Sequence, residues 1–217
     1  MNKFVDFAIQ VFRGKSIYRI LFNWQVAKYC QNLKGRCLDL ACGGEPSYYK
    51  YLFLANISEL IKTDYNNDKK PDLNIDLNKK LVFKNKSFDN IFLFNAIYII
   101  KKPEDLIREI YRILKKDGRF FMASPFIFNE AKEPDDYRRL TSQGLKRLLK
   151  KGGFKKFKII SFGERASAGV HLWHPFFLFN FVRFFAFSKA LFLDKLVPKK
   201  VRKLHPCSLG YFVIASR

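Results

Sequence analysis

The sequence predicts a single α/β domain with a Rossmann-like, seven-stranded, mostly parallel sheet flanked by helices. Short apolar runs with the character of strands alternate with helical patterns along most of the 217 residues. The first run ends at two glycines, Gly43 and Gly44, and the next ends at an acid, Asp64. Because 48% of the residues are hydrophobic, the chain can bury a substantial core.

The first half begins with a helical cap, predicted over residues 1–33. Within it, Phe4–Phe12 is interrupted by Asp6 and Gln10 and lacks a small-residue cleavage site, which indicates an amphipathic helix and not a signal peptide. A helix-compatible segment, Ser47–Leu54, follows the first strand. The strands of this half are predicted at about residues 36–41, 58–63, 73–75 and 89–95.

Two helices are predicted in the second half. Pro103 and Glu104 open one that runs through Leu114, because proline and an acid favour the first turn, and Asp117-Gly118 ends this segment. The other runs over residues 141–151 with Thr141 as its N-cap. The strands of this half are predicted at 119–124, 154–162 and 210–216. We divide the domain into a cap (1–33), a ligand-binding core (34–163), a hydrophobic and basic insertion (164–206) and the last strand (207–217).

The insertion contains Leu172–Leu193, an aromatic-rich and predominantly helical run. Its length would suffice to cross a bilayer, but Arg183 and Lys189 interrupt it, so a transmembrane helix is not predicted. Clustered Lys and Arg follow as far as Lys203, and aromatics beside cations suit an anionic membrane surface, contacted through 172–203. Alternatively, the phenylalanines cover the sheet or form a homodimer interface.

The net charge of +22 is unevenly distributed. Between Thr141 and Phe162 there is no acid, and this basic block attracts anionic surfaces or polyanions unless it is simply a solvated face. The block consists of Lys146, Arg147, Lys150, Lys151, Lys155, Lys156 and Lys158. Nucleic acid is the less favoured partner, because no recognisable RNA-binding motif accompanies the block.

Cysteine and histidine give weak signals. The four cysteines show no CxxC spacing and no disulfide framework, which indicates a reducing, cytoplasmic compartment. His171 and His174 have a spacing that could ligate a metal, but no Cys or acid cluster accompanies them, so no metal site is predicted.

The glycine turn and Asp64 predict the kind of ligand. A turn at Gly43-Gly44 lets a ligand approach backbone N–H groups, and an acid that closes the second strand commonly bonds ribose hydroxyls. The turn lacks the third glycine of a dinucleotide fingerprint, and a P-loop is absent. Acids at Asp39 and Glu45 would repel a pyrophosphate but attract an ammonium group. S-adenosyl-L-methionine (SAM) has an adenosine, an ammonium and a sulfonium, and it fits this pattern.

Four segments in order then resemble the class I SAM-dependent methyltransferases. Leu38–Gly44 is similar to their first motif, with Ala41 where a glycine is usual. Leu73–Leu77 resembles their third-strand segment. Ser87–Ile91 resembles the entry to the fourth strand, and Glu109–Gly118 resembles the helix and turn that follow.

The resemblance implies SAM as cofactor and assigns roles to residues at the strand ends. The glycine turn is implied to shape the methionine end, Asp64 to bind the ribose and Asp76 to approach the adenine. Asn95 and Ala96 are implied to lie beside the methyl group. The complete implied set is Asp39, Ala41, Cys42, Gly43, Gly44, Asp64, Tyr65, Asp76, Leu77, Asn95 and Ala96.

Residues 133–141 carry a narrower resemblance, to methyltransferase-domain proteins of bacterial cell-envelope polysaccharide pathways. The matching pattern is P-x-D-Y-x-R-[aromatic]-T, beginning at Pro134, and its candidate catalytic residues are Asp136, Tyr137 and Arg139. Asp136 could orient or deprotonate an acceptor hydroxyl, and Arg139 could clamp a phosphate or carboxylate. Alternatively, the two pair with each other and pin the loop. The histidine frequent in these relatives is replaced by Ala131, so no catalytic histidine is carried over.

These observations predict a SAM-dependent methyltransferase that O-methylates a sugar, a glycan or a lipid-linked acceptor, peripherally bound at the inner face of a membrane. An RNA methyltransferase that uses the basic block is the first alternative. A non-catalytic binding or scaffold protein is the second, because Ala41, Ala131 and Tyr98-Ile99 all depart from the family patterns.

Overall fold

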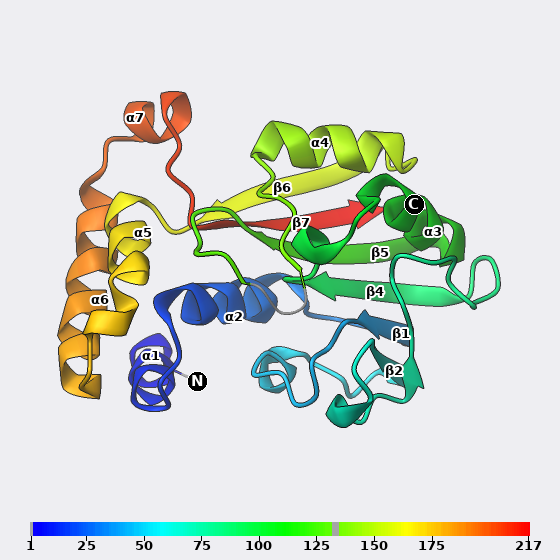
Figure 1. The fold of residues 1–217 in the computed structure, drawn as a ribbon, viewed down its shortest axis with the longest axis horizontal. Coiled ribbons are helices and arrows are strands. Elements are labelled where there is room, and N and C mark those ends of the chain that lie inside the picture. The colour runs from blue at the N-terminus through cyan, green and yellow to red at the C-terminus, as the bar shows by residue number, and fades with distance from the viewer. Residues whose placement is uncertain (1, 132–134) are drawn as a thin grey trace.

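A seven-stranded sheet with strand order β3-β2-β1-β4-β5-β7-β6 forms the centre of the protein (Figure 1). The structure is a computed structural model and describes residues 2–131 and 135–217. The strands are β1 (Gly35–Leu40), β2 (Ile57–Asp64), β3 (Leu73–Asn74), β4 (Phe88–Phe94), β5 (Leu114–Pro125), β6 (Lys156–Phe162) and β7 (Gly210–Ser216). β7 pairs antiparallel with β5 and β6, whereas the pairs among β1 to β5 are parallel. The predicted Rossmann-like fold is confirmed.

Helices cover both faces of the sheet, because its buried strands carry large apolar side chains on both sides. In β4, Ile91 and Leu93 point to the cluster under α3 (Pro103–Ile113) and α4 (Ser142–Lys151). Phe92 and Phe94 point to the opposite cluster, which includes side chains of α1 (Lys3–Phe12) and α2 (Ile17–Tyr29). Alternation along a strand fully buried on both faces thus produces the two core layers.

The N-terminal cap is two helices pinned to the core by a buried acid. Asp6 of α1 accepts hydrogen bonds from Gln10 Nε2 (2.7 Å), from Trp24 Nε1 (2.9 Å) and from the Tyr51 hydroxyl (2.6 Å). Lys50 also pairs with Asp6 at 3.3 Å. These groups come from both cap helices and from the segment after β1, so one carboxylate fixes the cap against the sheet.

The helix predicted at Ser47–Leu54 is wrong, because only Tyr49–Tyr51 forms a single 3₁₀ turn. The Tyr48 ring instead inserts edge-on against Phe22 of α2 and Phe94 of β4, at centroid distances of 5.7 and 5.0 Å. α2 therefore covers this face of the sheet, and the segment after β1 crosses it mostly without helical structure.

The end of the helix that begins at Pro103 also differs from the prediction. α3 ends at Ile113, and β5 begins at Leu114 instead of near residue 119. The last carbonyls of the helix have partners outside it: Arg112 O accepts from the Arg217 guanidinium, and Ile113 O accepts from the Ser87 N–H at 2.7 Å. These long-range hydrogen bonds satisfy the helix end without the predicted turn.

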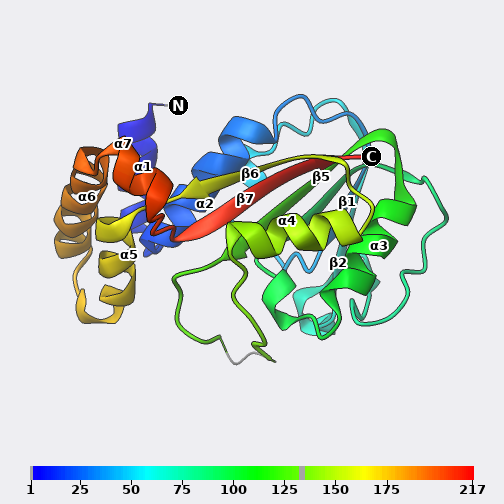
Figure 2. The same ribbon diagram turned by 90° about the horizontal axis from the view of Figure 1, so that it is seen from above.

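The insertion before the last strand is helical, as predicted. It comprises α5 (Arg165–Leu172), a 3₁₀ turn η4 (His174–Phe176), α6 (Asn180–Leu196) and α7 (Lys199–Leu204). α6 lies beside α1 in both ribbon views (Figures 1 and 2), and Phe184 contacts the rings of Phe4 and Phe7. Among the described residues, no helix has the length and apolar character needed to cross a membrane.

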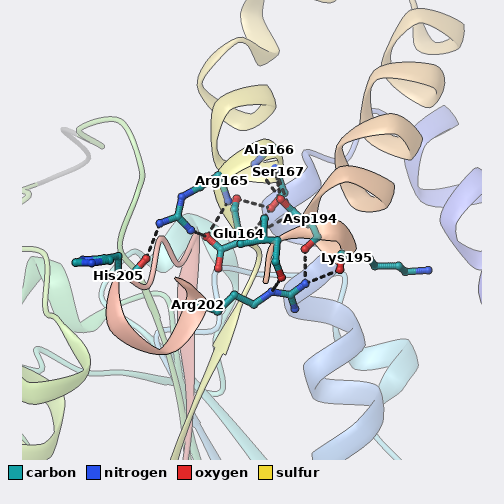
Figure 3. A network of polar contacts seen from close by, with 9 residues as sticks. Glu164, Arg165, Ala166, Ser167, Asp194, Lys195, Arg202 and His205 are labelled. Carbon is teal, nitrogen blue, oxygen red and sulfur yellow. Dashed lines mark hydrogen bonds and ion pairs between the residues drawn. The ribbon is translucent and has the colours of Figure 1, made fainter. Parts of the chain in front are cut away.

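A buried carboxylate joins α6 to the beginning of α5 (Figure 3). Asp194 accepts hydrogen bonds from the backbone N–H groups of Glu164 (3.2 Å), Ala166 (2.8 Å) and Ser167 (3.3 Å). Arg202 of α7 donates to the Asp194 carbonyl oxygen at 2.5 Å and to that of Lys195 at 2.9 Å. The helices of the insertion are therefore held to one another by side-chain-to-backbone bonds.

Candidate cofactor and acceptor site

The carboxyl ends of β1, β2 and β4 lie side by side and bring three predicted segments together. In the register, Leu40 pairs with Thr63 on one side and with Leu93 on the other. The Cys42 N–H donates to Thr63 O at 3.0 Å and extends this alignment into the turn. Residues 41–44, Asp64 and Asn95 thus lie at one edge of the sheet, where open α/β folds bind ligands.

The glycine turn has the backbone conformation that the motif requires. Gly43 and Gly44 have φ of 71° and 89°, in the region where side chains are strained. Ala41, where the family usually has glycine, adopts φ of 56° and so takes the left-handed conformation nevertheless. A Cβ added at Gly43 would meet nothing within 4 Å, so the turn borders open space that a ligand can enter.

Asp39 is fully buried beneath this turn. Its Oδ2 accepts from the Tyr48 hydroxyl at 2.6 Å, whereas its Oδ1 has no hydrogen-bond partner. The Tyr49 hydroxyl lies close to the same carboxylate. Burial raises the pKa of Asp39 to about 7, although the Tyr48 hydrogen bond acts in the opposite direction. An unpartnered carboxylate oxygen beneath an open turn fits a cofactor that has a cationic end.

The raised pKa makes Asp39 a cost to stability at neutral and alkaline pH. An acid whose folded pKa lies above its unfolded value stabilises the protein fully below the unfolded pKa, near 3.8, and this contribution is lost as the pH rises to about 7. We therefore expect Asp39→Asn to be more stable than the wild type at pH 8, by on the order of 2–4 kcal/mol, with a much smaller difference at pH 4.5. Urea unfolding at the two pH values measures this, with Asp68→Asn as the exposed control. A pH-independent difference would contradict the assignment.

Asp64 lies at the end of β2 with both carboxylate oxygens directed at backbone N–H groups. Oδ2 accepts from Gly43 at 2.8 Å, and Oδ1 accepts from Asn66 at 3.0 Å. The carboxylate thereby holds the glycine turn, and each oxygen retains capacity for a further donor. Next to it, the Tyr65 side chain is exposed, at 68% of its maximal surface.

The next predicted residues lie beyond β3. Asp76 accepts from the Asn78 N–H at 2.9 Å and pairs with Lys79 at 3.7 Å. The Leu77 side chain is buried in the core, so only its backbone is free to face a ligand.

Asn95, at the end of β4, has a partner that the sequence did not reveal. The Tyr18 hydroxyl from α2 donates to Asn95 Oδ1 at 2.5 Å, and the buried Asn95 Nδ2 is left without a partner. Asn95 has φ of 56°, and the neighbouring Ala96 is buried. Tyr18 lies 77 positions away in the cap and carries no local signal of a site, so only the fold identifies it.

The candidate catalytic segment is held by an internal ion pair. Both Asp136 oxygens accept from the Arg139 guanidinium, and this pairing lowers the pKa of the Asp136 carboxyl. Asp136 also accepts from the Ala131 N–H at 2.9 Å. Tyr137 is half-exposed, and its N–H donates to Tyr98 O at 2.9 Å. The structure thus has the pairing that the sequence left open, while Pro134 of this motif lies outside the described residues.

A buried histidine, His171, lies next to Tyr18, the residue that donates to Asn95. The buried His171 ring packs 4.8 Å from Phe128 and 5.9 Å from Tyr18, and neither of its nitrogens has a partner. Burial lowers its pKa to about 4, so the ring is neutral at physiological pH. In the part of the chain that the structure describes, no group of three or more His, Cys, Asp and Glu could hold a metal ion.

Comparisons with known proteins agree with this geometry. Residues 38–122 match the family described as "Methyltransferase domain". A search of curated proteins found no match. Among solved structures, a SAM-dependent methyltransferase from Archaeoglobus fulgidus is similar at a TM-score of 0.63 and 17% identity, over 96% of this chain and 97% of that one.

Two further structures have the same fold. A chain of the complex between the Haloferax volcanii Trm112 methyltransferase activator and the putative methyltransferase matches at a TM-score of 0.61 and 16% identity, over 97% of this chain and 96% of that one. Phosphoethanolamine N-methyltransferase 2 of Haemonchus contortus, in complex with SAM, matches at 0.58 and 16%, over 90% of this chain. The match spans only 52% of that longer protein. The family match over residues 38–122 and the shared fold agree with the predicted resemblance to the class I SAM-dependent methyltransferases.

Proposed function

We propose that the chain transfers the methyl group of SAM to a hydroxyl of a sugar, a glycan or a lipid-linked acceptor at the surface of an anionic membrane. The observation that carries the membrane location is a set of exposed aromatic side chains on α1, on α6 and on the segment between α5 and α6, which we call the aromatic face. Its members are Phe4, Phe12, Trp173, Phe176, Phe179, Phe181 and Phe185, each more than half exposed.

Ring contacts join several members of this aromatic face. Phe184 bridges the two helices, with centroid distances of 6.0 Å to Phe4 and 6.3 Å to Phe12. Within the insertion, Phe179 stacks on Phe181 at 5.6 Å. Patches of this kind on a soluble domain mark an interaction surface, because water disfavours so much contiguous apolar area.

Cations surround this face and favour a membrane over a neutral protein partner. Lys3 and Arg13 flank its α1 side, and the exposed lysines Lys195, Lys199, Lys200 and Lys203 follow at the far end of α6. Aromatic side chains beside lysine and arginine suit the boundary between headgroups and acyl chains, where the cations attract anionic lipid. The net charge of +22 acts in the same direction.

The residues of the cofactor site have defined roles in this proposal. When bound, SAM supplies an electrophilic methyl group on its sulfonium. The turn at residues 41–44, with Cys42 and the Asp39 carboxylate beneath it, receives the methionine end. Asp64 and Tyr65 face the ribose, and the region of Asp76 and the Leu77 backbone faces the adenine. Asn95, oriented by Tyr18 and followed by Ala96, lies beside the methyl group.

The acceptor then has to be held in line with the methyl group, and positioning is the main source of catalysis here. Residues Asp136, Tyr137 and Arg139 form the proposed acceptor segment at the same sheet edge. Arg139 keeps Asp136 ionised and bonds to both of its carboxylate oxygens. We therefore propose that this pair fixes the conformation of the segment. Tyr137, whose half-exposed side chain is free to turn toward the acceptor, is assigned to contacting it.

The test supplies labelled SAM together with vesicles that contain lipid-linked glycans, soluble glycans or RNA. We expect label in the glycan fractions, and we expect Phe181→Ser/Phe185→Ser to lose at least about tenfold in vesicle binding and in methylation of the lipid-linked acceptor. Methylation of soluble glycans should be unchanged in this variant. Val82→Ser is the control, because Val82 is an exposed apolar residue that does not belong to the aromatic face.

Three outcomes would overturn the proposal. Label in RNA with a steep salt dependence would instead favour the basic block on α4 and β6 as a nucleic-acid surface. A concentration-dependent dimer that the phenylalanine variant abolishes would assign the aromatic face to a second copy of the chain. Lack of SAM binding by folded protein would favour a binding or scaffold role.

A further inference from the structure

A cavity of about 550 Å³ lies between the cap and the glycine turn, and among the described residues Gly44 is the one member of the assigned cofactor and acceptor sites that lines it. Its wall on the cap side contains Gln10, Arg13, Lys15 and Asn23, and its opposite wall contains Gly44–Ser47, Tyr49, Lys50 and Lys62. This volume is in the range of small-molecule sites and exceeds what a bare inorganic anion needs.

The charges that line the cavity are strongly unbalanced. Four cations face it, Arg13, Lys15, Lys50 and Lys62, against a single acid, Glu45. Of these cations, Lys50 already pairs with Asp6 at 3.3 Å. Within the described part of the chain, Arg13, Lys15 and Lys62 form no ion pair within 4 Å. The cavity therefore presents unneutralised positive charge to whatever enters it.

The side-chain amides on the cap side of the wall are already engaged in hydrogen bonds. Gln10 Oε1 accepts from Asn23 Nδ2 at 2.7 Å, and Asn23 Nδ2 also reaches Ser47 Oγ at 3.3 Å. Gln10 Nε2 in turn donates to the buried Asp6. This chain of hydrogen bonds fixes the back of the cavity, and the cations are the groups left to bind a ligand.

The cavity adjoins the aromatic face through two consecutive residues. Phe12, the last residue of α1, is exposed on that face, and Arg13 lines the cavity. The Phe12 carbonyl accepts from Asn180 Nδ2 of α6 at 3.1 Å, which ties this junction to the insertion. A ligand with an anionic group next to an apolar chain could therefore place the anion in the cavity and the chain on the aromatic face.

We propose that this cavity binds the phosphate ester of a lipid-linked acceptor while the aromatic face contacts its lipid. This inference rests on the proposed function and specifies its substrate class. Arg13 supplies a fork of donors that matches phosphate oxygens, and the lysines add point charges. The glycine turn on the opposite wall would then hold the cofactor close to the head of the same acceptor.

The test measures binding alone, so that it does not depend on turnover. Full-length protein is titrated with sn-glycerol 3-phosphate, with glycerol as the neutral control, and is then mixed with phosphatidylcholine vesicles with and without phosphatidic acid. We expect saturable binding of glycerol 3-phosphate and preferential binding to the vesicles with phosphatidic acid. Arg13→Gln/Lys15→Gln should weaken both by about tenfold or more. Lys28→Gln/Lys34→Gln removes the same charge from exposed positions outside the cavity and should change neither by more than about twofold.

SAM affinity, measured on the same variants, both reports folding and separates the outcomes. Unchanged SAM affinity with weakened phosphate binding supports the inference. Parallel loss of SAM and phosphate binding would instead assign the cavity to the cofactor and overturn it. If the two double variants weaken binding equally, the overall net charge and not the cavity attracts the phosphate, and the inference is overturned. Binding of soluble phosphate without preference for phosphatidic acid would overturn the lipid source. If neutral glycans are methylated although phosphate fails to bind, the inference fails while the proposed function stands.

Discussion

Replacing Asp64 with alanine is expected to lower the affinity for SAM by about a hundredfold. Two ribose hydroxyls that donate to one carboxylate form charge-assisted hydrogen bonds, and their loss is worth about 2.7 kcal/mol. The substitution has a second effect, because Asp64 also accepts from the Gly43 N–H at 2.8 Å and so holds the glycine turn. Both effects act on the same binding equilibrium.

Calorimetric titration with SAM and with S-adenosylhomocysteine measures this effect. Asp68→Ala is the matched control, since it removes an exposed carboxylate four positions away. The backbone N–H of Asp68, which donates to Asn66 Oδ1, is kept in this variant. Asp64→Asn keeps one acceptor oxygen, and its affinity should fall between those of Asp64→Ala and the wild type. Unchanged SAM affinity in Asp64→Ala would remove Asp64 from the site.

Replacing Asp194 with alanine is expected to destabilise the protein by about 3 kcal/mol. Three backbone N–H groups at the beginning of α5 would lose their acceptor in a buried environment, and each unsatisfied buried donor costs about 1–3 kcal/mol before relaxation. The same change removes the polar link between α6 and the beginning of α5, so the loss concerns the packing of the insertion's own helices.

Urea unfolding followed by circular dichroism measures the change, and hydrogen exchange at Ala166 and Ser167 reports it locally. Lys195→Ala is the control, because Lys195 follows Asp194 directly and its side chain is exposed. Arg202 donates only to the Lys195 backbone carbonyl, which the substitution keeps. A loss no larger than that of the control would show that apolar packing alone holds α6 against α5. SAM affinity should change little, because Asp194 lies in the insertion, away from the strand ends that form the cofactor site.

The correct sequence predictions rest on local chemistry. A Thr141 side chain that caps its own helix, accepting from the Gly144 N–H at 3.1 Å, needs only neighbours three residues away. The glycine turn is equally local, since a positive φ at Gly43 and Gly44 depends on the absence of a Cβ. The mostly parallel sheet follows because strands that alternate with helices leave few other ways to connect them.

The wrong predictions were those in which distant residues competed with local preference. Ser47–Leu54 has a helical pattern, but α2 covers the face of the sheet on which a helix would pack. The strand after the helix at Pro103 begins at Leu114 and not near residue 119, and Arg217, from the far end of the chain, donates to the Leu114 carbonyl. Periodicity within a window cannot include a partner more than a hundred positions away.

By itself, the sequence determined the fold class and the strand ends at which the cofactor is proposed to bind, because both depend on residue types within short windows. Only the tertiary structure decided that Tyr18 orients Asn95, that Tyr48 bonds to a buried Asp39, and that Asp136 is occupied by Arg139. It also brought Arg13 and Lys15 opposite Lys62 across one cavity. Such contacts join elements that are far apart in the chain, and hydrogen bonding and burial select them only once the sheet has formed.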